Sequence, residues 1–231
     1  MLRPKQMTIR GLNKNQAWDY ENGFYWYSPY TRLAKQIAHW EIYKRILSVP
    51  GDVVELGVYK GASLIRWATF REISENSFSR NIVGFDAFGQ FPLSSSASKD
   101  DIEFVEGFSN AGGDGLSLIE LTEIFEHKKF QNITLNKGDI FKTIPEHLSA
   151  HPHLKVSLLH LDMDIYEPTI FALENLWDRV SNGGIVVVDD YNAVSGATRA
   201  VDEFISNRGI SSKIEKSPFY SIPSFIVKQN R

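Results

Sequence analysis

The sequence predicts an α/β protein with a mostly parallel, doubly wound sheet and helices on both faces. Short apolar runs alternate with amphipathic segments through most of the chain, which is typical of strands joined by crossover helices. Several of these runs end in acidic residues, as expected where strands supply a site at one sheet edge. Two further strand-like runs, 212–216 and 224–228, predict an antiparallel edge at the end of the chain.

The first half of the chain begins with an arm, residues 1–30, that is polar and then rich in tyrosine and tryptophan. We expect its aromatics to pack against the domain or a second subunit, with a ligand-binding wall as the alternative. Residues 31–231 form one domain, whose helix at 31–47 has apolar residues at helical spacing and ends in turn residues. Strands at 52–57 and 81–86 and a helix at 62–73 follow.

The second half opens with residues 88–115, which are rich in serine and glycine with little periodicity. We interpret them as a lid or loop that contains a short helix. Periodicity and turn residues then predict alternating elements, with Gly209 closing the last helix. These are a helix at 116–129, a strand at 133–135, a helix from 143, a strand at 156–161, a helix at 168–180, a strand at 184–188 and a helix at 197–207.

Composition excludes several classes of protein. The chain of 231 residues, 42% hydrophobic and 13% aromatic, suits one sizeable globular domain. The absence of cysteine excludes disulfides, thiolate metal sites and a cysteine nucleophile. A net charge of −3 without a long basic run makes nucleic acid an unlikely obligate partner. With neither a membrane-length apolar run nor a secretory signal, we expect a cytoplasmic protein without a membrane partner.

A glycine motif follows the first strand of the domain and precedes a helix. The motif is the stretch ELGVYKGAS at residues 55–63, and its candidate site residues are Glu55, Gly57, Tyr59, Gly61 and Ser63. Glycines there let the backbone approach a ligand, while the helix N-terminus offers free N–H groups. The spacing is neither that of a dinucleotide site nor that of a phosphate loop. A tight turn that needs glycine only for packing is the alternative.

Two acids follow the next strands along the chain. Asp86 ends the second strand, where an acid can accept the hydroxyls of a nucleoside ribose. Asp139 follows the third strand, where an acid can receive a hydrogen bond from an adenine amino group. A turn or helix-capping role is the alternative for both residues.

The most specific feature is a pair of acidic segments, LHLDMDIY and GGIVVVDDY, separated by about one helix. Their four acids are expected to gather at one sheet edge. Carboxylate oxygens suit magnesium, calcium or manganese, and their mutual repulsion would raise pKa values unless a cation compensates. His160 is expected to be a core residue rather than a ligand. Solvated strand-end acids are the alternative interpretation of Asp162, Asp164, Asp189 and Asp190.

These blocks resemble the macrocin O-methyltransferase (TylF-type) family. The similarity rests on LHLDMDIYEPTIFALENLWDRVSNGGIVVVDDY, VPGDVVELGVYKGASL, VGFDAFGQFP, NKGDIFKTIP and ATRAVDEFISNRGI, within residues 48–210. The family uses S-adenosylmethionine and magnesium to methylate sugar hydroxyls. The resemblance therefore implies the Rossmann-like class I methyltransferase fold, a seven-stranded sheet whose last strand is antiparallel. It also implies a sugar-containing small-molecule acceptor: a deoxysugar, a nucleotide sugar or a glycosylated natural product.

The resemblance also implies a role for the individual residues of these blocks. In the cofactor site, Glu55, Gly57 and Gly61 line the methionine end, Asp86 holds the ribose and Asp139 lies near the adenine. Tyr59, Ser63 and Asp162 are the further cofactor-binding residues. Mg²⁺ or another divalent cation would be bound by Asp162, Asp189 and Asp190. Asp164 would be the catalytic general base.

Rival functions remain open on the same residues. One is a metal-dependent, catechol-type O-methyltransferase acting on phenols. Another is a metal-dependent hydroxylase or hydrolase, and a third is a non-catalytic cofactor-binding protein. The four-acid cluster argues against the third, because a scaffold has no reason to keep repelling carboxylates together. The aromatic arm makes a homodimer plausible.

Overall fold

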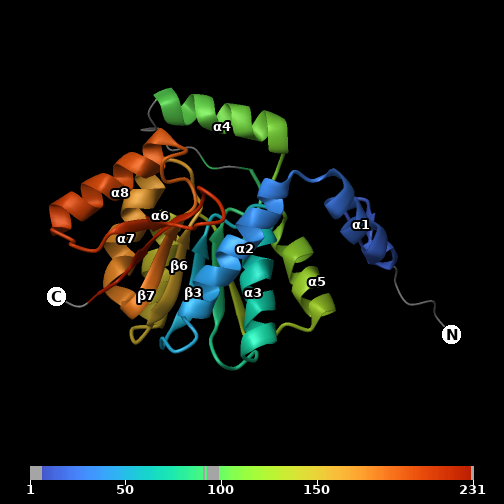
Figure 1. The fold of residues 1–231 in the computed structure, drawn as a ribbon, viewed down its shortest axis with the longest axis horizontal. Helices are drawn as coiled ribbons and strands as arrows, with labels where there is room; N and C mark the ends of the chain where they lie inside the picture. The colour runs from blue at the N-terminus through green and yellow to red at the C-terminus, as the bar shows by residue number, and fades with distance from the viewer. Residues whose placement is uncertain (1–6, 91, 93–98, 230–231) are drawn as a thin grey trace.

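A seven-stranded sheet forms the centre of the computed structural model, which describes residues 7–90, 92 and 99–229 (Figure 1). The strand order is β5-β4-β3-β6-β7-β9-β8. Pairings from β5 to β7 are parallel, whereas β9 is antiparallel to both β7 and β8. The strands are β3 (Asp52–Leu56), β4 (Ile82–Asp86), β5 (Ile133–Lys137), β6 (Val156–Leu161), β7 (Val180–Val188), β8 (Ile214–Lys216) and β9 (Ser224–Val227).

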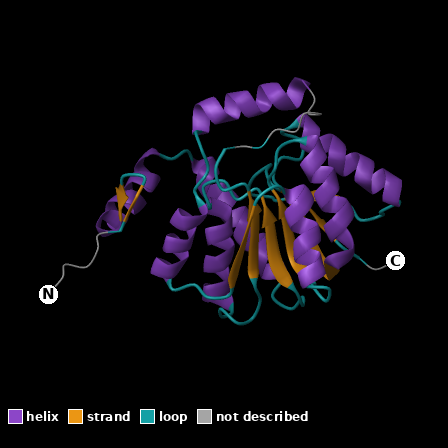
Figure 2. Cartoon of the chain, turned by 180° about the vertical axis from the view of Figure 1, so that it is seen from behind, coloured by secondary structure: helices purple, strands orange, loops and turns teal. Residues whose placement is uncertain are grey.

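Helices cover both faces of this sheet, so the predicted α/β fold, with a mostly parallel seven-stranded sheet and an antiparallel C-terminal strand, is confirmed (Figure 2). One buried cluster joins the sheet to α6 (Ile140–Ala150), α7 (Tyr166–Leu176) and α8 (Ser195–Arg208). The other joins it to α2 (Tyr30–Arg45), α3 (Ala62–Ser74) and α5 (Leu118–Lys128). Neighbouring strand residues such as Val53 and Val54 belong to opposite clusters, because side chains alternate across a strand.

The chain reverses direction across the sheet between β3 and β6. From β3 it moves outward through β4 to β5, then returns to β6 on the other side of β3. Loops that leave β3 and β6 therefore diverge to opposite faces and open a crevice at their carboxyl ends. In doubly wound sheets ligands bind at this switch point.

Some elements differ from the sequence prediction at their bounds. The segment 88–115 contains α4 (Lys99–Gly112), which is longer than the short helix expected there, while residues 91 and 93–98 lie outside the described part. This helix lies across the end of the sheet in both views (Figures 1 and 2). Helix α6 begins at Ile140 rather than near 143, because Asp139 caps it.

The N-terminal arm contains a small hairpin, β1 (Thr8–Ile9) with β2 (Leu12–Asn13), a short η1 (Lys14–Gln16) and α1 (Ala17–Tyr27). The arm lies to one side of the sheet, beside α5 (Figure 1). Trp18 and Tyr27 are 78% and 84% exposed, so their burial against this chain's own domain is not found. The expectation of a second subunit on these aromatics stays a prediction.

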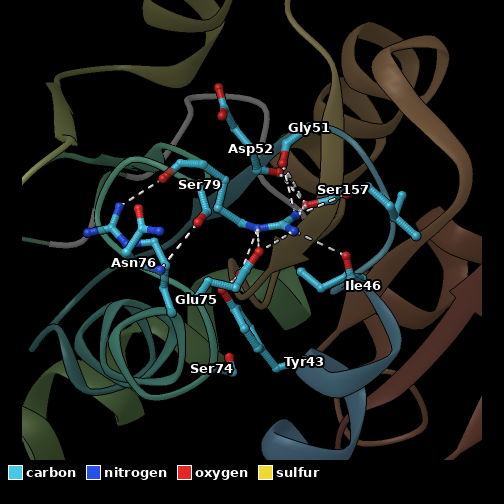
Figure 3. A network of polar contacts seen from close by, with 12 residues as sticks. Tyr43, Ile46, Gly51, Asp52, Ser74, Glu75, Asn76, Ser79 and Ser157 are labelled. Atoms are coloured by element: carbon cyan, nitrogen blue, oxygen red, sulfur yellow. Dashed lines mark hydrogen bonds and ion pairs between the residues drawn. The ribbon is translucent and has the colours of Figure 1, made fainter.

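A buried ionic network ties the amino ends of the strands together. The guanidinium of Arg80 donates to Glu75 at 2.8 Å and to the hydroxyl of Ser157 at 2.6 Å. The hydroxyl of Tyr43 donates to the same glutamate at 2.7 Å. Figure 3 shows Tyr43, Glu75 and Ser157 converging from α2, α3 and β6. This network stabilises the sheet edge opposite the crevice.

Within the described residues, no helix combines the length and apolar character that a bilayer-spanning segment requires.

Candidate active site

The carboxyl ends of β6 and β7 bring the two acidic segments side by side. Leu161 pairs with Val188 in the parallel ladder, and the N–H of Asp189 donates to the carbonyl of Leu161 at 2.9 Å. On the other side of β6, the N–H of Asp162 donates to the carbonyl of Leu56 at 2.9 Å. The acids that follow β6 and β7 therefore meet at the switch-point crevice beside the end of β3.

Three of the four acids form one tight group. Carboxylate oxygens of Asp162, Asp164 and Asp190 lie within 4.8 Å of one another. Asp164 has a left-handed backbone, with φ of 63°, and its carbonyl accepts from the N–H of Ala197 in α8 at 3.1 Å. A non-glycine residue in this conformation is strained, and such strain clusters at functional sites. One oxygen of Asp190 is buried without a hydrogen-bond partner among the described residues.

Burial and mutual repulsion raise the pKa of every acid in this group. Burial, then the charges of Asp189 and Asp190, raises the pKa of Asp162 well above its usual value. Burial and then Asp162 raise the pKa of Asp164 to about 7. Burial and then Asp164 raise the pKa of Asp190 to about 8. An all-oxygen donor set short of positive charge fits a hard divalent cation such as Mg²⁺.

Asp189 has different partners from the other three acids. Its Oδ2 accepts from Nζ of Lys35 at 2.5 Å, and its Oδ1 lies 3.5 Å from Nε2 of His160. Nδ1 of His160 lies 3.0 Å from a carboxylate oxygen of Glu55, which is fully buried. Burial alone would lower the pKa of His160, but Asp189 and Glu55 raise it to about 10. Burial alone would raise the pKa of Asp189, but the imidazoles of His160 and His39, whose Nε2 atoms lie 3.5 and 3.9 Å from its Oδ1, and the charge of Lys35 hold it well below its usual value.

His39, His160 and Asp189 also place ligand-type atoms within 4.8 Å of one another, but they do not suit a metal. Each ring nitrogen of His160 faces a carboxylate, Nδ1 that of Glu55 and Nε2 that of Asp189, and these carboxylates raise its pKa so that the charged ring is favoured. Burial lowers the pKa of His39 to about 3, so its ring is neutral. Its Nδ1 lies 2.9 Å from a guanidinium nitrogen of Arg66 and must accept, which leaves Nε2 carrying the hydrogen. Neither histidine therefore offers a lone pair towards Asp189, and His160 is the core residue that the sequence predicted.

The glycine motif lies directly against the acid group. Gly57 has φ of +88°, and a Cβ added there would lie 1.7 Å from the carbonyl oxygen of Asp162. Gly61, with φ of +74°, starts α3 without a side-chain cap. Tyr59 packs on Phe108 of α4 with ring centroids 4.9 Å apart. The glycines thus allow close packing of the chain around them, which is the alternative that the sequence left open. At Gly57 the absence of a side chain also leaves the backbone exposed to the cavity.

Glu55 and Ser63 occupy different layers of the site. Ser63 lines the cavity, and its hydroxyl donates to Glu55 at 2.9 Å. The resemblance placed Glu55 against the cofactor, whereas its carboxylate lies behind the cavity wall, between Ser63 and His160. Glu55 is therefore positioned to act through these two side chains rather than by direct contact.

Asp86 and Asp139 both line the cavity while performing local structural roles. One oxygen of Asp86 accepts from the N–H groups of Val58 and Tyr59 at 2.8 and 2.9 Å, which braces the glycine loop. Asp139 caps α6 by accepting from the N–H of Phe141 at 3.0 Å. The turn and capping roles left open by the sequence are both present, on the side of the cavity away from β7.

The cavity between these elements has a volume of about 560 Å³, within the range of small-molecule sites. Part of its wall is basic, with Arg32 and Lys35 from α2 and Arg66 from α3. Sequence reasoning missed these three residues. The available signal was the spacing of Arg32, Lys35 and His39, which at i, i+3 and i+7 share one face of a helix.

Known proteins resemble this chain in sequence and in fold. Residues 35–221 match the family described as Macrocin-O-methyltransferase (TylF). An 8-demethyl-8-(2,3-dimethoxy-alpha-L-rhamnosyl)-tetracenomycin-C 4'-O-methyltransferase of Streptomyces olivaceus is 28% identical over 184 residues, covering 73% of this chain and 63% of that protein. A demethyldecarbamoylnovobiocin O-methyltransferase of Streptomyces niveus is 27% identical over 183 residues, covering 72% of this chain and 63% of that protein.

A solved structure, that of the O-methyltransferase NovP, superposes with a TM-score of 0.74 at 22% identity, covering 85% of this chain and 80% of the other. The chain thus spans about 63% of the length of the two curated relatives. The family match extends over most of the chain and includes the glycine motif and all four acids. On this evidence the chain belongs to the macrocin-O-methyltransferase (TylF) family.

Proposed function

We propose that this protein is an S-adenosylmethionine- and divalent-cation-dependent O-methyltransferase that acts on a sugar hydroxyl of a small molecule. The observation that carries the proposal is the group of Asp162, Asp164 and Asp190 beside the glycine motif, at the switch point of the sheet. Membership of a methyltransferase family supports the reaction, and the rhamnosyl group in one relative's name supports the acceptor class.

The residues around the cavity fit S-adenosylmethionine. The exposed backbone at Gly57 and the uncapped start of α3 suit the polar methionine end, with Ser63 beside them. Asp86 and Asp139 line the part of the cavity that would receive the ribose and the adenine. Tyr59 and Phe108 close the cavity from the side of α4.

The four acids divide into two kinds by their protonation. Asp189 is kept ionised by Lys35 and His160, which suits a permanent metal ligand. Asp162 and Asp190 belong to the oxygen group and would hold the cation together with Asp189, whose Oδ2 accepts from Lys35. Asp164 belongs to the same oxygen group, so its carboxylate is placed to take a proton from a hydroxyl bound there.

In this mechanism Asp164 accepts the proton of the acceptor hydroxyl. The oxygen that results is the nucleophile for methyl transfer. When bound, the cation would stabilise the negative charge that develops on that oxygen. The short distances within the acid group would keep the base next to a hydroxyl bound there, and Phe108 and Ser109 of α4 line the same cavity. Lys35 balances the charge of Asp189 when the cation is absent.

Asp164→Asn tests this proposal. The variant should bind S-adenosylhomocysteine as the wild type does, measured by calorimetry, because asparagine tolerates the left-handed backbone. It should bind Mg²⁺ more weakly than the wild type, because one negative charge of the oxygen group is removed. Its rate of S-adenosylhomocysteine release with rhamnosyl-bearing acceptors should fall by about 10²–10⁴-fold.

Asp178→Asn is the matched control, since Asp178 is exposed and pairs with Arg208 away from the cavity. A near-normal rate in Asp164→Asn would remove this residue from the base role. Full wild-type activity in EDTA would remove the cation, and a wild type that does not bind S-adenosylhomocysteine would refute the methyltransferase assignment.

A further inference from the structure

Two arginines of the cavity wall have no acidic partner in the described part of the chain. Arg32 on α2 and Arg66 on α3 both line the cavity, and neither has a carboxylate oxygen within ion-pair distance. Arg66 lies 2.9 Å from Nδ1 of His39, which is a neutral acceptor. Two lysines also line the cavity: Lys35 is already paired with Asp189, and Nζ of Lys60 donates to the carbonyl of Gly112 at 2.6 Å. In the described part of the chain, positive charge without an ion pair therefore remains on the two guanidinium groups and on Lys60.

The electrostatic surroundings of these arginines favour an anion. Burial lowers the pKa of Arg66; the charges of Glu55, Asp189 and Asp162 oppose this shift without forming an ion pair, and the like charge of Arg32 adds to it. Two like charges that face one cavity repel each other unless an anion lies between them. Guanidinium groups match the planar oxygens of carboxylates and the oxygens of phosphates, often with two parallel hydrogen bonds. The wall is thus built to receive an oxyanion rather than a neutral group.

The location of the pair relates this anion to the acceptor. Arg32 precedes Lys35 by three residues on α2, so the two residues lie roughly 4.5 Å apart along the helix axis and on the same side of it. Lys35 in turn contacts Asp189 at the edge of the acid group. A sugar with one hydroxyl at Asp164 can therefore direct an acidic substituent at Arg32 and Arg66.

We propose that Arg32 and Arg66 form an oxyanion subsite for a phosphate or carboxylate carried by the sugar acceptor. The proposal rests on the sugar O-methyltransferase function proposed above and narrows its substrate to acidic sugars or sugar phosphates. The cofactor also carries a carboxylate, but the glycine motif and the uncapped N-terminus of α3 provide separate donors for its methionine end. The acceptor is accordingly the source of the anion at the arginine pair.

Binding of three sugars tests the subsite without any need for turnover. Isothermal titration calorimetry with glucose 1-phosphate, glucuronate and glucose would compare a phosphate, a carboxylate and a neutral probe. The wild type should bind at least one charged probe about tenfold more tightly than glucose, as one charge-assisted hydrogen bond predicts. Which charged probe is preferred distinguishes a sugar phosphate from a sugar acid.

Variants assign this preference to the arginine pair. R32Q and R66Q should each remove most of it, and R66K should keep part of it because it retains the charge. Arg32 is exposed, so R32Q tests the subsite even if R66Q disturbs the fold. R45Q is the matched control, because Arg45 lies on the same helix but pairs with Glu215 away from the cavity.

Equal affinity of the wild type for all three sugars would overturn the subsite, and so would a preference that survives in both R32Q and R66Q. A loss of S-adenosylhomocysteine affinity in these variants, with sugar binding unchanged, would assign the anion to the cofactor and also overturn the proposal. Failure of the wild type to bind S-adenosylhomocysteine would count against the methyltransferase function alone, because the sugar titrations are performed without cofactor.

Discussion

Replacing Asp164 should change the stability of the metal-free protein in a way that depends on pH. The structure raises the pKa of this carboxyl from 3.8 to about 7, through burial first and the charge of Asp162 second. Because the unfolded chain ionises at lower pH than the folded chain, the wild type should lose stability as the pH rises from about 4 to about 7. Asparagine carries no charge at any pH, so Asp164→Asn should not suffer this loss.

The magnitude follows from the two pKa values. The gap between 3.8 and about 7 corresponds to about 4 kcal/mol, at about 1.4 kcal/mol per pKa unit. The free energies of unfolding of Asp164→Asn and wild type should therefore be similar near pH 4. Above pH 7 the variant should be more stable by up to about 4 kcal/mol. Backbone strain adds little to the difference, since aspartate and asparagine both tolerate a left-handed conformation.

Urea unfolding in EDTA between pH 4.5 and 8.5 measures this difference, with Asp178→Asn as a control whose offset from wild type should not vary with pH. Mg²⁺ at pH 8.5 should narrow the gap, because a bound cation compensates the charge that destabilises the wild type. A gap that is constant across the pH range would refute the reasoning. So would a variant less stable than wild type at pH 8.5.

Two further predictions concern packing. Gly57→Ala should lose S-adenosylhomocysteine binding and unfold at a lower temperature, because its Cβ would lie 1.7 Å from the carbonyl oxygen of Asp162. Gly23→Ala is the control, because a Cβ at this position of α1 would meet no atom within 4 Å and the residue does not line the cavity. Melting temperatures that are not lower in Gly57→Ala would contradict the close approach. Arg80→Met should lower the free energy of unfolding by about 3–5 kcal/mol, by leaving the buried carboxylate of Glu75 without its cation. Its affinity for S-adenosylhomocysteine should not change, and a stability loss below about 1 kcal/mol would contradict the importance of the network.

The fold could be predicted from the sequence because each strand and helix has its own local pattern of apolar and polar residues. Apolar runs such as VSLLHL predict a buried strand, and amphipathic segments between such runs predict crossover helices. The order of these elements leaves few topologies, since crossovers between parallel strands keep one hand. The gathering of Asp162, Asp164 and Asp190 follows from this topology without any knowledge of tertiary contacts.

The features that the sequence did not predict depend on tertiary contacts between elements that are far apart in the chain. Lys35 belongs to a helix whose apolar stripe was correctly expected, yet nothing local indicates that its polar face lines a cavity rather than water. Likewise, the richness of the arm in aromatics does not say what covers them, and Trp18 remains 78% exposed. The depth of Glu55 was also hidden, because a strand-end acid next to glycines can face the ligand or the core with the same sequence.

The distribution of charge explains why the acids differ in their roles. Lys35 and His160 both direct their charge at Asp189, and Glu55 takes the other side of His160. The remaining acids receive little compensation, so Asp164 and Asp190 have pKa values of about 7 and 8. A single ammonium cannot neutralise three neighbouring carboxylates, whereas a dication bound among them would bring each pKa down. Among the four acids, the positively charged side chains Lys35 and His160 thus lie only at Asp189, the carboxylate that stays ionised. The negative charge of Asp162, Asp164 and Asp190 is left with little compensation, and this favours binding of a divalent cation.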